Sequence, residues 1–317
     1  MNKLTTELKT LHEATINNLK NSKSKNTLKA YKSDFKDFAF FCDKHHLQSL
    51  STTPNTISLY LTYLSKNLKV STLRRRLVSI GMVHKLKGKY IDTKHPIIIE
   101  NLTGIKRSLG SIQKGKKPLL ANHLKMIINL INNQKTEEVV KLRDKSIILI
   151  GFSGGFRRSE IISIDYEDLE FVNEGLKIIV KKSKTDQYGE GMIKGLPHFL
   201  NEDYCPVYNV KKWLEISKIK SGAIFRRFSK GSKLTDSRLT DQTVALLIKK
   251  YLNLCGIEGS NFSGHSLRSG FATVAAESGA EERSIMAMTG HKTTQMVRRY
   301  IKEANIFKNN ALNKVKI

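Results

Sequence analysis

Residues 110–118, with the sequence Gly-Ser-Ile-Gln-Lys-Gly-Lys-Lys-Pro, most constrain how this chain can fold. The stretch combines glycine, proline and like charges, so it cannot bury a hydrophobic core of its own. A chain of 317 residues also exceeds the usual size of a single core. We therefore expect two domains, connected by a linker at residues 111–118.

Apolar residues before the linker recur with the period of an amphipathic helix. They stand three or four positions apart at Leu28, Tyr31, Phe35, Phe38 and Cys42. A capping residue followed by proline predicts a second helix from Thr53-Pro54, and a third is expected from Ser71-Thr72. Residues 20–110 are thus predicted to form a small helical domain, preceded by an N-terminal extension at residues 1–19.

The part after the linker also has mainly helical patterns. One apolar stripe follows it at Leu124, Ile127, Ile128 and Ile131. Between residues 176 and 196, β-branched residues and glycines predict two strands joined by a turn at roughly 183–190. Further helices are expected around residues 206–216, 240–255, 265–278, 281–288 and 293–302. We predict a mainly α (α+β) protein with a small antiparallel sheet, a second domain at 119–305 and a tail at 306–317.

The charge of the chain predicts a polyanionic partner. Its 55 Lys and Arg outnumber its 28 Asp and Glu, which gives a formal charge of +27 and a pI near 9.9. Because the positive charge is spread along the chain, a folded surface that binds nucleic acid is favoured over a disordered basic arm. An acidic membrane surface is the competing partner, and it predicts liposome association that DNA does not compete away.

The apolar runs and the cysteines predict an intracellular protein. No apolar run approaches the ~20 residues of a membrane span, and the start of the chain lacks the apolar stretch of a signal peptide. Three widely spaced cysteines, in no pairing pattern, favour a reducing, cytoplasmic compartment, where a DNA-binding protein would associate with the nucleoid. Cys42, His45 and His46 crowd together, but no second ligand pair stands at a zinc spacing, so we expect no metal.

Four short segments carry the residues with the clearest chemistry. They are Gly-Phe-Arg-Arg-Ser-Glu at 155–160, Lys-Lys-Ser-Lys-Thr-Asp at 181–186, Gly-His-Ser-Leu-Arg at 264–268, and the stretch from Gly-His to Arg-Arg-Tyr at 290–300. Cationic donors aimed at phosphate oxygens offset the negative charge that builds up when a phosphodiester is cleaved. A His-x-x-Arg pair alone is a weak signal, but a following Gly-His with tyrosine nine residues later is specific. The candidate catalytic residues are Arg157, Lys184, His265, Arg268, His291 and Tyr300.

In their order and separation, these segments resemble the tyrosine recombinases, also called the phage integrase family. The resemblance covers residues 118–305 with specific motifs, and less specifically residues 20–110, which are similar to the family's SAM-like core-binding domain. It implies a simple, Xer-like site-specific DNA recombinase or integrase that cuts and rejoins strands through a 3′-phosphotyrosyl intermediate. The resemblance further implies strand exchange through a Holliday junction, a tetramer on synapsed double-stranded DNA, and no cofactor.

The resemblance also implies the role of each residue. Tyr300 would attack the phosphate and release a 5′ hydroxyl, Lys184 would protonate the leaving oxygen, and His265 would assist proton transfer at the tyrosine. Arg157 and Arg268 would clamp the phosphate. The remaining assignments are His291 as a donor to a non-bridging oxygen and Ser159 and Glu160 as supports of Arg157.

Two features of the sequence suggest further contacts. Arg74, Arg75 and Arg76 occupy the polar face of the third predicted helix, where they would contact the DNA backbone or simply form a solvated face. The tail at 306–317 continues an amphipathic pattern. Docking of this tail on a neighbouring subunit and packing on its own domain remain equal alternatives.

Two rival functions share parts of this pattern. A type IB topoisomerase-like enzyme uses the same chemistry without strand exchange, and it would relax a plasmid independently of site. A non-enzymatic DNA-binding protein on the same scaffold should have lost some of the six catalytic candidates, whereas all six are present. Accessory DNA-bending or directionality proteins would be additional partners of a recombinase.

Overall fold

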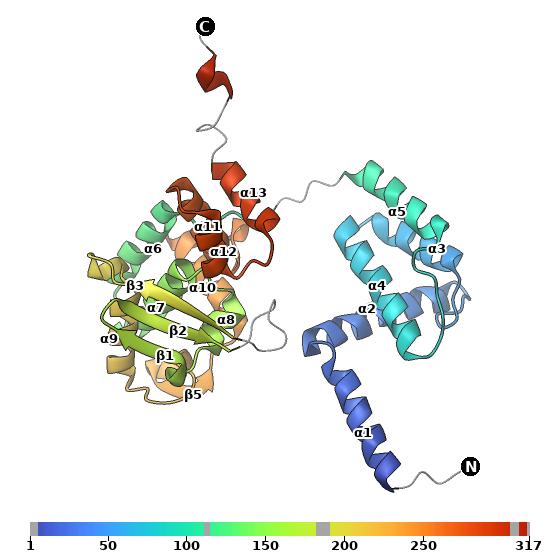
Figure 1. Cartoon of the computed structure of the whole chain (residues 1–317), viewed down its shortest axis with the longest axis horizontal. Helices are drawn as coiled ribbons and strands as arrows, with labels where there is room; N and C mark the ends of the chain where they lie inside the picture. Colours follow the sequence, from blue (N-terminus) through green and yellow to red (C-terminus); the bar gives the residue numbers. More distant parts are fainter. Residues whose placement is uncertain (1–5, 111–114, 182–190, 305–310, 316–317) are drawn as a thin grey trace. The chain divides into compact units, whose positions relative to one another are not determined.

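The computed structural model describes residues 6–110, 115–181, 191–304 and 311–315. The chain divides into two compact units, residues 1–114 and 115–317, and each is treated by itself. Helices dominate both units (Figure 1), which confirms the predicted mainly helical fold with a small antiparallel sheet. None of the helices in the described residues is long and apolar enough to cross a lipid bilayer.

The N-terminal unit is a small helical bundle. Its helices are α1 (Thr6–Asn21), α2 (Lys25–Lys44), α3 (Pro54–Ser65), α4 (Val70–Leu86) and α5 (Pro96–Leu109). The predicted apolar stripes meet in one core, which includes Phe38, Cys42, Leu61 and Leu73. Thr53 caps α3 by accepting a hydrogen bond from the Thr56 amide, as the sequence predicts. Helix α4 begins at Val70, just before the predicted start, and α5 was not predicted as a helix.

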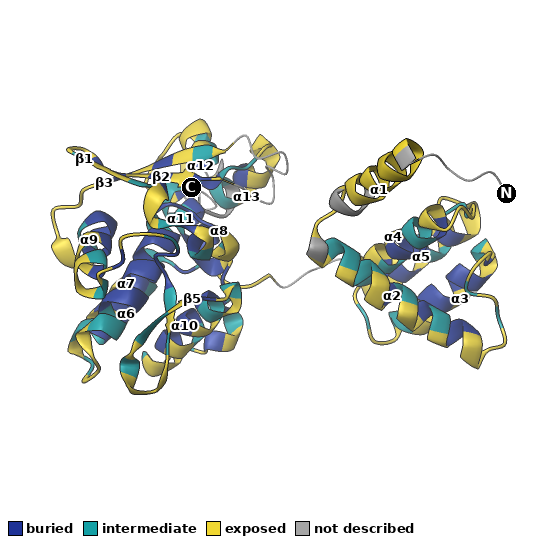
Figure 2. Cartoon of the chain, turned by 90° about the horizontal axis from the view of Figure 1, so that it is seen from below, coloured by how far each residue is buried: buried dark blue, intermediate teal, exposed yellow. Residues whose placement is uncertain are grey.

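Helices of the second unit surround one buried helix. The set comprises α6 (Ala121–Asn133), α7 (Glu138–Ser153), α8 (Arg158–Ser163), α9 (Pro206–Ser217), α10 (Asp241–Leu254), α11 (Ser266–Glu277), α12 (Glu282–Thr289) and α13 (Thr294–Ala304). Every residue of α7 from Leu142 to Gly151 is buried, so this helix forms the centre of the domain (Figure 2). Residues 115–118 belong to this unit, where the Lys117 amide donates to the Asn261 carbonyl.

A three-stranded antiparallel sheet covers one side of this core. Its order is β1 (Leu169–Val172), β2 (Gly175–Val180) and β3 (Met192–Pro197). Strands β2 and β3 are the predicted pair, and their connection lies mostly outside the described residues. Strand β1 and a second, two-stranded sheet of β4 (Arg226–Phe228) and β5 (Leu234–Arg238) were not predicted.

Candidate active site

The first candidate arginine stands at a tight turn between α7 and α8. Gly155 has a φ of +54°, in the left-handed region that favours glycine, and a Cβ on Gly154 would lie 2.1 Å from the Phe156 ring. Arg157 follows as the N-cap of α8, and its backbone N–H donates to Glu160 Oε2 at 2.9 Å. The glycines therefore allow the chain to present Arg157 directly beside the packed Phe156.

Glu160 orients the Arg157 side chain. Arg157 Nη1 donates to Glu160 Oε1 at 2.6 Å, and the glutamate is only 2% exposed. Because both carboxylate oxygens bind Arg157, one at the backbone and one at the guanidinium, the rotamer of the arginine is restricted. Ser159, the other expected support, is exposed and makes no side-chain hydrogen bond within the described part of the chain.

Arg268 is a buried cation with unused hydrogen-bonding capacity. Its side chain is 1% exposed on α11, and Nη1 donates to the Gly155 carbonyl at 2.9 Å. Its Nε and Nη2 atoms are buried without any partner in the described residues. Burial, followed by the charge of Arg157, lowers the pKa of Arg268 to about 10. Leaving such donors unpaired is costly, so their geometry indicates a site for an anion beside the two arginines.

His265 and Tyr300 line one cavity. His265 is the exposed N-cap residue of α11, and Tyr300 lies half-buried on α13. The cavity has a volume of about 260 Å³ and also includes Ser269 and Thr273 from α11. Tyr300 packs against a small apolar cluster that contains Val297 and holds α13 on α11. The fold thereby brings a phenol and an imidazole from distant parts of the sequence to one surface.

His291 lies against Tyr300 and is neutral. Their ring centroids are 6.2 Å apart, with an angle of 31° between the planes. Thr289 Oγ1 donates its single proton to the Ile285 carbonyl at 2.6 Å, so it accepts from His291 Nδ1 at 2.8 Å. Burial first, and then the charges of Arg268 and other cations, lowers the pKa of His291 to about 4. The free protein therefore carries His291 with its proton on Nδ1 and a lone pair on Nε2.

A buried lysine lies beneath the turn that carries Arg157, and sequence reasoning missed it. Lys194, on β3, donates from Nζ to the Gly154 carbonyl at 2.7 Å, and Nζ lies 4.0 Å from the centroid of the Phe156 ring. A lysine in a strand is ordinarily assigned to the solvent face. The signal that could have identified it is the alternation of β3, because Lys194 shares the inward row with Leu196. The predicted Lys184 lies outside the described residues.

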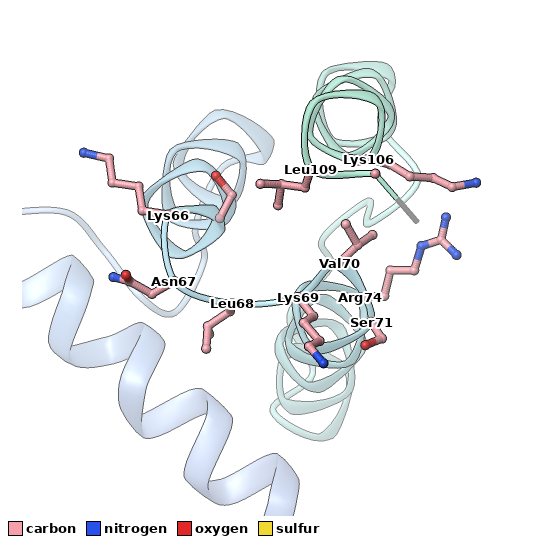
Figure 3. Close-up of a pocket in the computed structure, with 11 residues that line it drawn as sticks. Lys66, Asn67, Leu68, Lys69, Val70, Ser71, Arg74, Lys106 and Leu109 are labelled. Atoms are coloured by element: carbon pink, nitrogen blue, oxygen red, sulfur yellow. The ribbon is translucent and has the colours of Figure 1, made fainter. Parts of the chain in front are cut away.

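The three predicted DNA-binding arginines have different surroundings. Arg75 forms an ion pair with Asp34, and Arg76 pairs with Asp37. Arg74 is exposed and has no ion-pair or hydrogen-bond partner in the described residues. It lines a pocket of about 640 Å³ at the start of α4, together with three lysines (Figure 3). These lysines are Lys66, Lys69 and Lys106.

Two family profiles match the chain. The profile of the Phage integrase family matches residues 118–305, and that of the Phage integrase, N-terminal SAM-like domain matches residues 16–87. The "Integrase/recombinase xerD homolog" of Selenomonas ruminantium is 40% identical over 300 residues, which cover 94% of this chain and 87% of that protein. Tyrosine recombinase XerD of Rickettsia prowazekii is 27% identical, with 86% of each chain covered.

Solved recombinase structures have the same fold. XerH, bound to a palindromic difH substrate in a post-cleavage complex, superimposes with a TM-score of 0.60 at 18% identity, covering 81% of this chain and 73% of XerH. A lambda integrase dimer on a COC′ core site gives a TM-score of 0.60 at 17% identity, covering 93% and 75%. Together with the profile matches and the Selenomonas relative, these findings show that the chain belongs to the phage integrase family of tyrosine-type, site-specific DNA recombinases.

Proposed function

We propose that this recombinase cuts DNA with Tyr300 while Arg157 and Arg268 hold the scissile phosphate. The observation that carries the proposal is the buried guanidinium of Arg268, whose Nε and Nη2 have no partner in the described residues. A planar guanidinium can present two parallel N–H groups to a phosphate. Comparable arginine contacts are worth about 10³–10⁵ in rate in other phosphoryl-transfer enzymes.

The cleavage step transfers one bond and two protons. The Tyr300 oxygen forms a bond to phosphorus, and the bond from phosphorus to the 5′ oxygen breaks. His265, which shares the cavity with Tyr300, accepts the phenol proton. Lys184 supplies a proton to the leaving 5′ oxygen. The 3′ end stays on Tyr300 as a phosphotyrosine, so the bond energy is kept for rejoining.

His291 changes its protonation when the phosphate arrives. In the free protein its Nδ1–H donates to Thr289, so Nε2 must gain a proton before it can donate to a phosphate oxygen. The negative phosphate favours that proton and raises the pKa of His291 from its low value of about 4. A cationic His291 would then stabilise the same oxygens that Arg157 and Arg268 contact.

The N-terminal unit supplies contacts to the DNA backbone. The pocket at the start of α4 gathers Arg74, Lys66, Lys69 and Lys106, and none of them forms an ion pair with an acidic residue in the described part of the unit. Such exposed cations can neutralise phosphates and release condensed counterions. Arg75 and Arg76 contribute less to backbone contacts because Asp34 and Asp37 neutralise them.

The functional assembly is a tetramer on two synapsed duplexes. It acts in the cytoplasm, associated with the nucleoid. Accessory DNA-bending or directionality proteins determine the direction of recombination. Four protomers exchange strands in pairs through a Holliday junction. The tail at 306–317 docks on a neighbouring protomer in this assembly. Truncation after Lys308 should then prevent synapsis, and unchanged tetramer formation on DNA would reject the docking.

Strand cleavage is tested with nicked suicide duplexes drawn from DNA that flanks the gene. Wild type should give a protein–DNA band that resists SDS, whereas Tyr300→Phe should bind the same fragment without forming the band. Absence of the band with wild type on a tightly bound fragment, or a band with both proteins, would reject Tyr300 as nucleophile. Recombinants from two-site plasmids, rather than relaxation independent of site, distinguish a recombinase from a topoisomerase.

A further inference from the structure

Lys194 occupies the inward face of a β-strand, where an apolar residue is expected. On β3 the exposed residues Ile193 and Gly195 alternate with the buried Lys194 and Leu196. In the sheet register Lys194 lies opposite Ile178, which is also fully buried. The lysine side chain is 0% exposed. A buried ammonium group is strongly unfavourable unless polar partners surround it, so its presence in this row indicates a specific task.

The contacts of Lys194 all lead to the turn that carries Arg157. Its Nζ donates to the Gly154 carbonyl at 2.7 Å and lies 4.0 Å from Glu160 Oε2. Arg268 binds the next carbonyl along the chain, that of Gly155. Two cations, from β3 and α11, thus hold consecutive peptide groups of one turn.

Glu160 links this arrangement to the arginine itself. One carboxylate oxygen accepts from Arg157 Nη1, and the other accepts from the Arg157 backbone N–H and faces Lys194. Without the lysine, Glu160 would be balanced by Arg157 alone, and the Gly154 carbonyl would lose the bond donated by Lys194. A shift of the turn by even about 1 Å can cost about 10²-fold in rate, because the reaction depends on alignment.

We propose that Lys194 is a positioning residue of strand cleavage, which fixes the Arg157 turn through the Gly154 carbonyl. Its second contact, with Glu160, keeps the carboxylate oriented toward the arginine. The inference rests on the proposed function of Tyr300 and Arg157, and it adds a residue that does not touch the DNA. Lys194 thereby connects β3 to Arg157 and Arg268, the two arginines proposed to hold the phosphate.

Charges around Lys194 support a pH-dependent role. Burial first lowers the pKa of Lys194 to about 7, Glu160 on α8 opposes this decrease, and Arg268 and Arg157 add to it. The charge of Lys194 in turn contributes to the lowered pKa of His291, which follows α12. A bound phosphate would add negative charge to this group of cations and favour the protonated lysine. Lys194 therefore binds the turn most strongly when DNA is present and loses its charge at alkaline pH.

The test compares Lys194→Met, which keeps an unbranched side chain as far as Cε but removes the ammonium group, with Lys177→Met as a matched control. Lys177 is an exposed lysine in the same sheet, on β2. We expect Lys194→Met to form the covalent adduct on suicide duplexes about 10- to 100-fold more slowly than wild type at pH 7. DNA binding should change less than about 3-fold, and Lys177→Met should cleave at the wild-type rate.

The pH profile separates positioning from packing. The ratio of the wild-type rate to the Lys194→Met rate should fall between pH 7 and about 9.5, because a neutral lysine loses its advantage over methionine. Equal rates at pH 7, or a ratio that stays constant over this range, would overturn the inference.

A second measurement uses the free protein and needs no DNA. The folded-state pKa of Lys194 is below its unfolded value, so the unfolded chain binds more protons above pH 7 and stability rises with pH. The melting temperature of wild type should therefore rise relative to Lys194→Met from pH 7 to about 9.5, and a flat difference would contradict the buried contact. If wild type forms no adduct, the proposed function is rejected. If wild type forms the adduct and Lys194→Met forms it at the same rate, only the role of Lys194 is rejected.

Discussion

Replacing Arg268 by methionine should reduce cleavage strongly without destabilising the free protein. The guanidinium is 1% exposed, and its pKa of about 10 corresponds to a penalty of about 3 kcal/mol for keeping the buried group charged. Methionine removes that penalty, but it leaves the Gly155 carbonyl without the Arg268 donor, which costs about 1–3 kcal/mol. The net change in the free energy of unfolding is therefore between about zero and 2 kcal/mol in the stabilising direction.

Cleavage should change in the opposite direction. Loss of an arginine contact to the phosphate is expected to slow adduct formation by about 10³-fold or more. The assay combines thermal melting without DNA and adduct formation on a suicide duplex. Arg158→Met is the control, because it removes the same charge from an exposed arginine whose ion-pair partner is Asp241. A melting temperature more than about 5 °C below that of wild type would show that the charged guanidinium stabilises the free protein, and adduct formation at the wild-type rate would exclude a contact between Arg268 and the phosphate.

Three further substitutions probe Glu160, His291 and the arginines of α4. Glu160→Gln should slow adduct formation by about 10-fold or more, without weakening DNA binding in a mobility-shift assay, because the amide offers only one acceptor oxygen to Arg157. The pKa of His291 is about 4 in the folded protein, below its unfolded value of about 6.5. The melting temperature of wild type should therefore fall relative to that of His291→Gln as the pH is lowered from about 6.5 to 4. A constant difference between the two melting temperatures would contradict a buried neutral imidazole. Arg74→Ala should reduce the slope of log K against log salt by about 1, and Arg75→Ala should reduce it less; equal losses would contradict the different surroundings of the two arginines.

Local signals made much of the helical architecture predictable. The Thr53-Pro54 cap and the apolar stripe of α6 specify their helices within a few residues, and both elements occur as predicted. Helix α5 was missed because a short apolar run such as Ile97–Ile99 fits a helix or a strand equally well. Helix α7 was not predicted either. Its residues Leu142–Gly151 are buried on every side, and polar and apolar residues among them do not separate into the two faces of an amphipathic pattern.

Side-chain partners from distant segments were not predictable. The motifs identify Arg157, Arg268 and Tyr300 because their spacing is specific, and the fold brings Arg157 and Arg268 to one turn. The alternation along β3 places Lys194 in the same row as Leu196, but its partners Gly154 and Glu160 come from a distant segment, so their contacts with the lysine depend on the fold. Likewise, the pairing of Arg75 with Asp34 depends on how α4 packs on α2.

Covalent attachment of DNA to Tyr300 can be located directly on the protein. The covalent adduct would be digested with nuclease and with a protease that cuts after glutamate, which releases residues 283–303 as one peptide with a single tyrosine. Mass spectrometry should find a residual nucleotide on that peptide, with fragmentation placing it on Tyr300. A nucleotide on any other residue, or an unmodified 283–303 peptide recovered from purified adduct, would exclude Tyr300 as the residue that attacks the DNA.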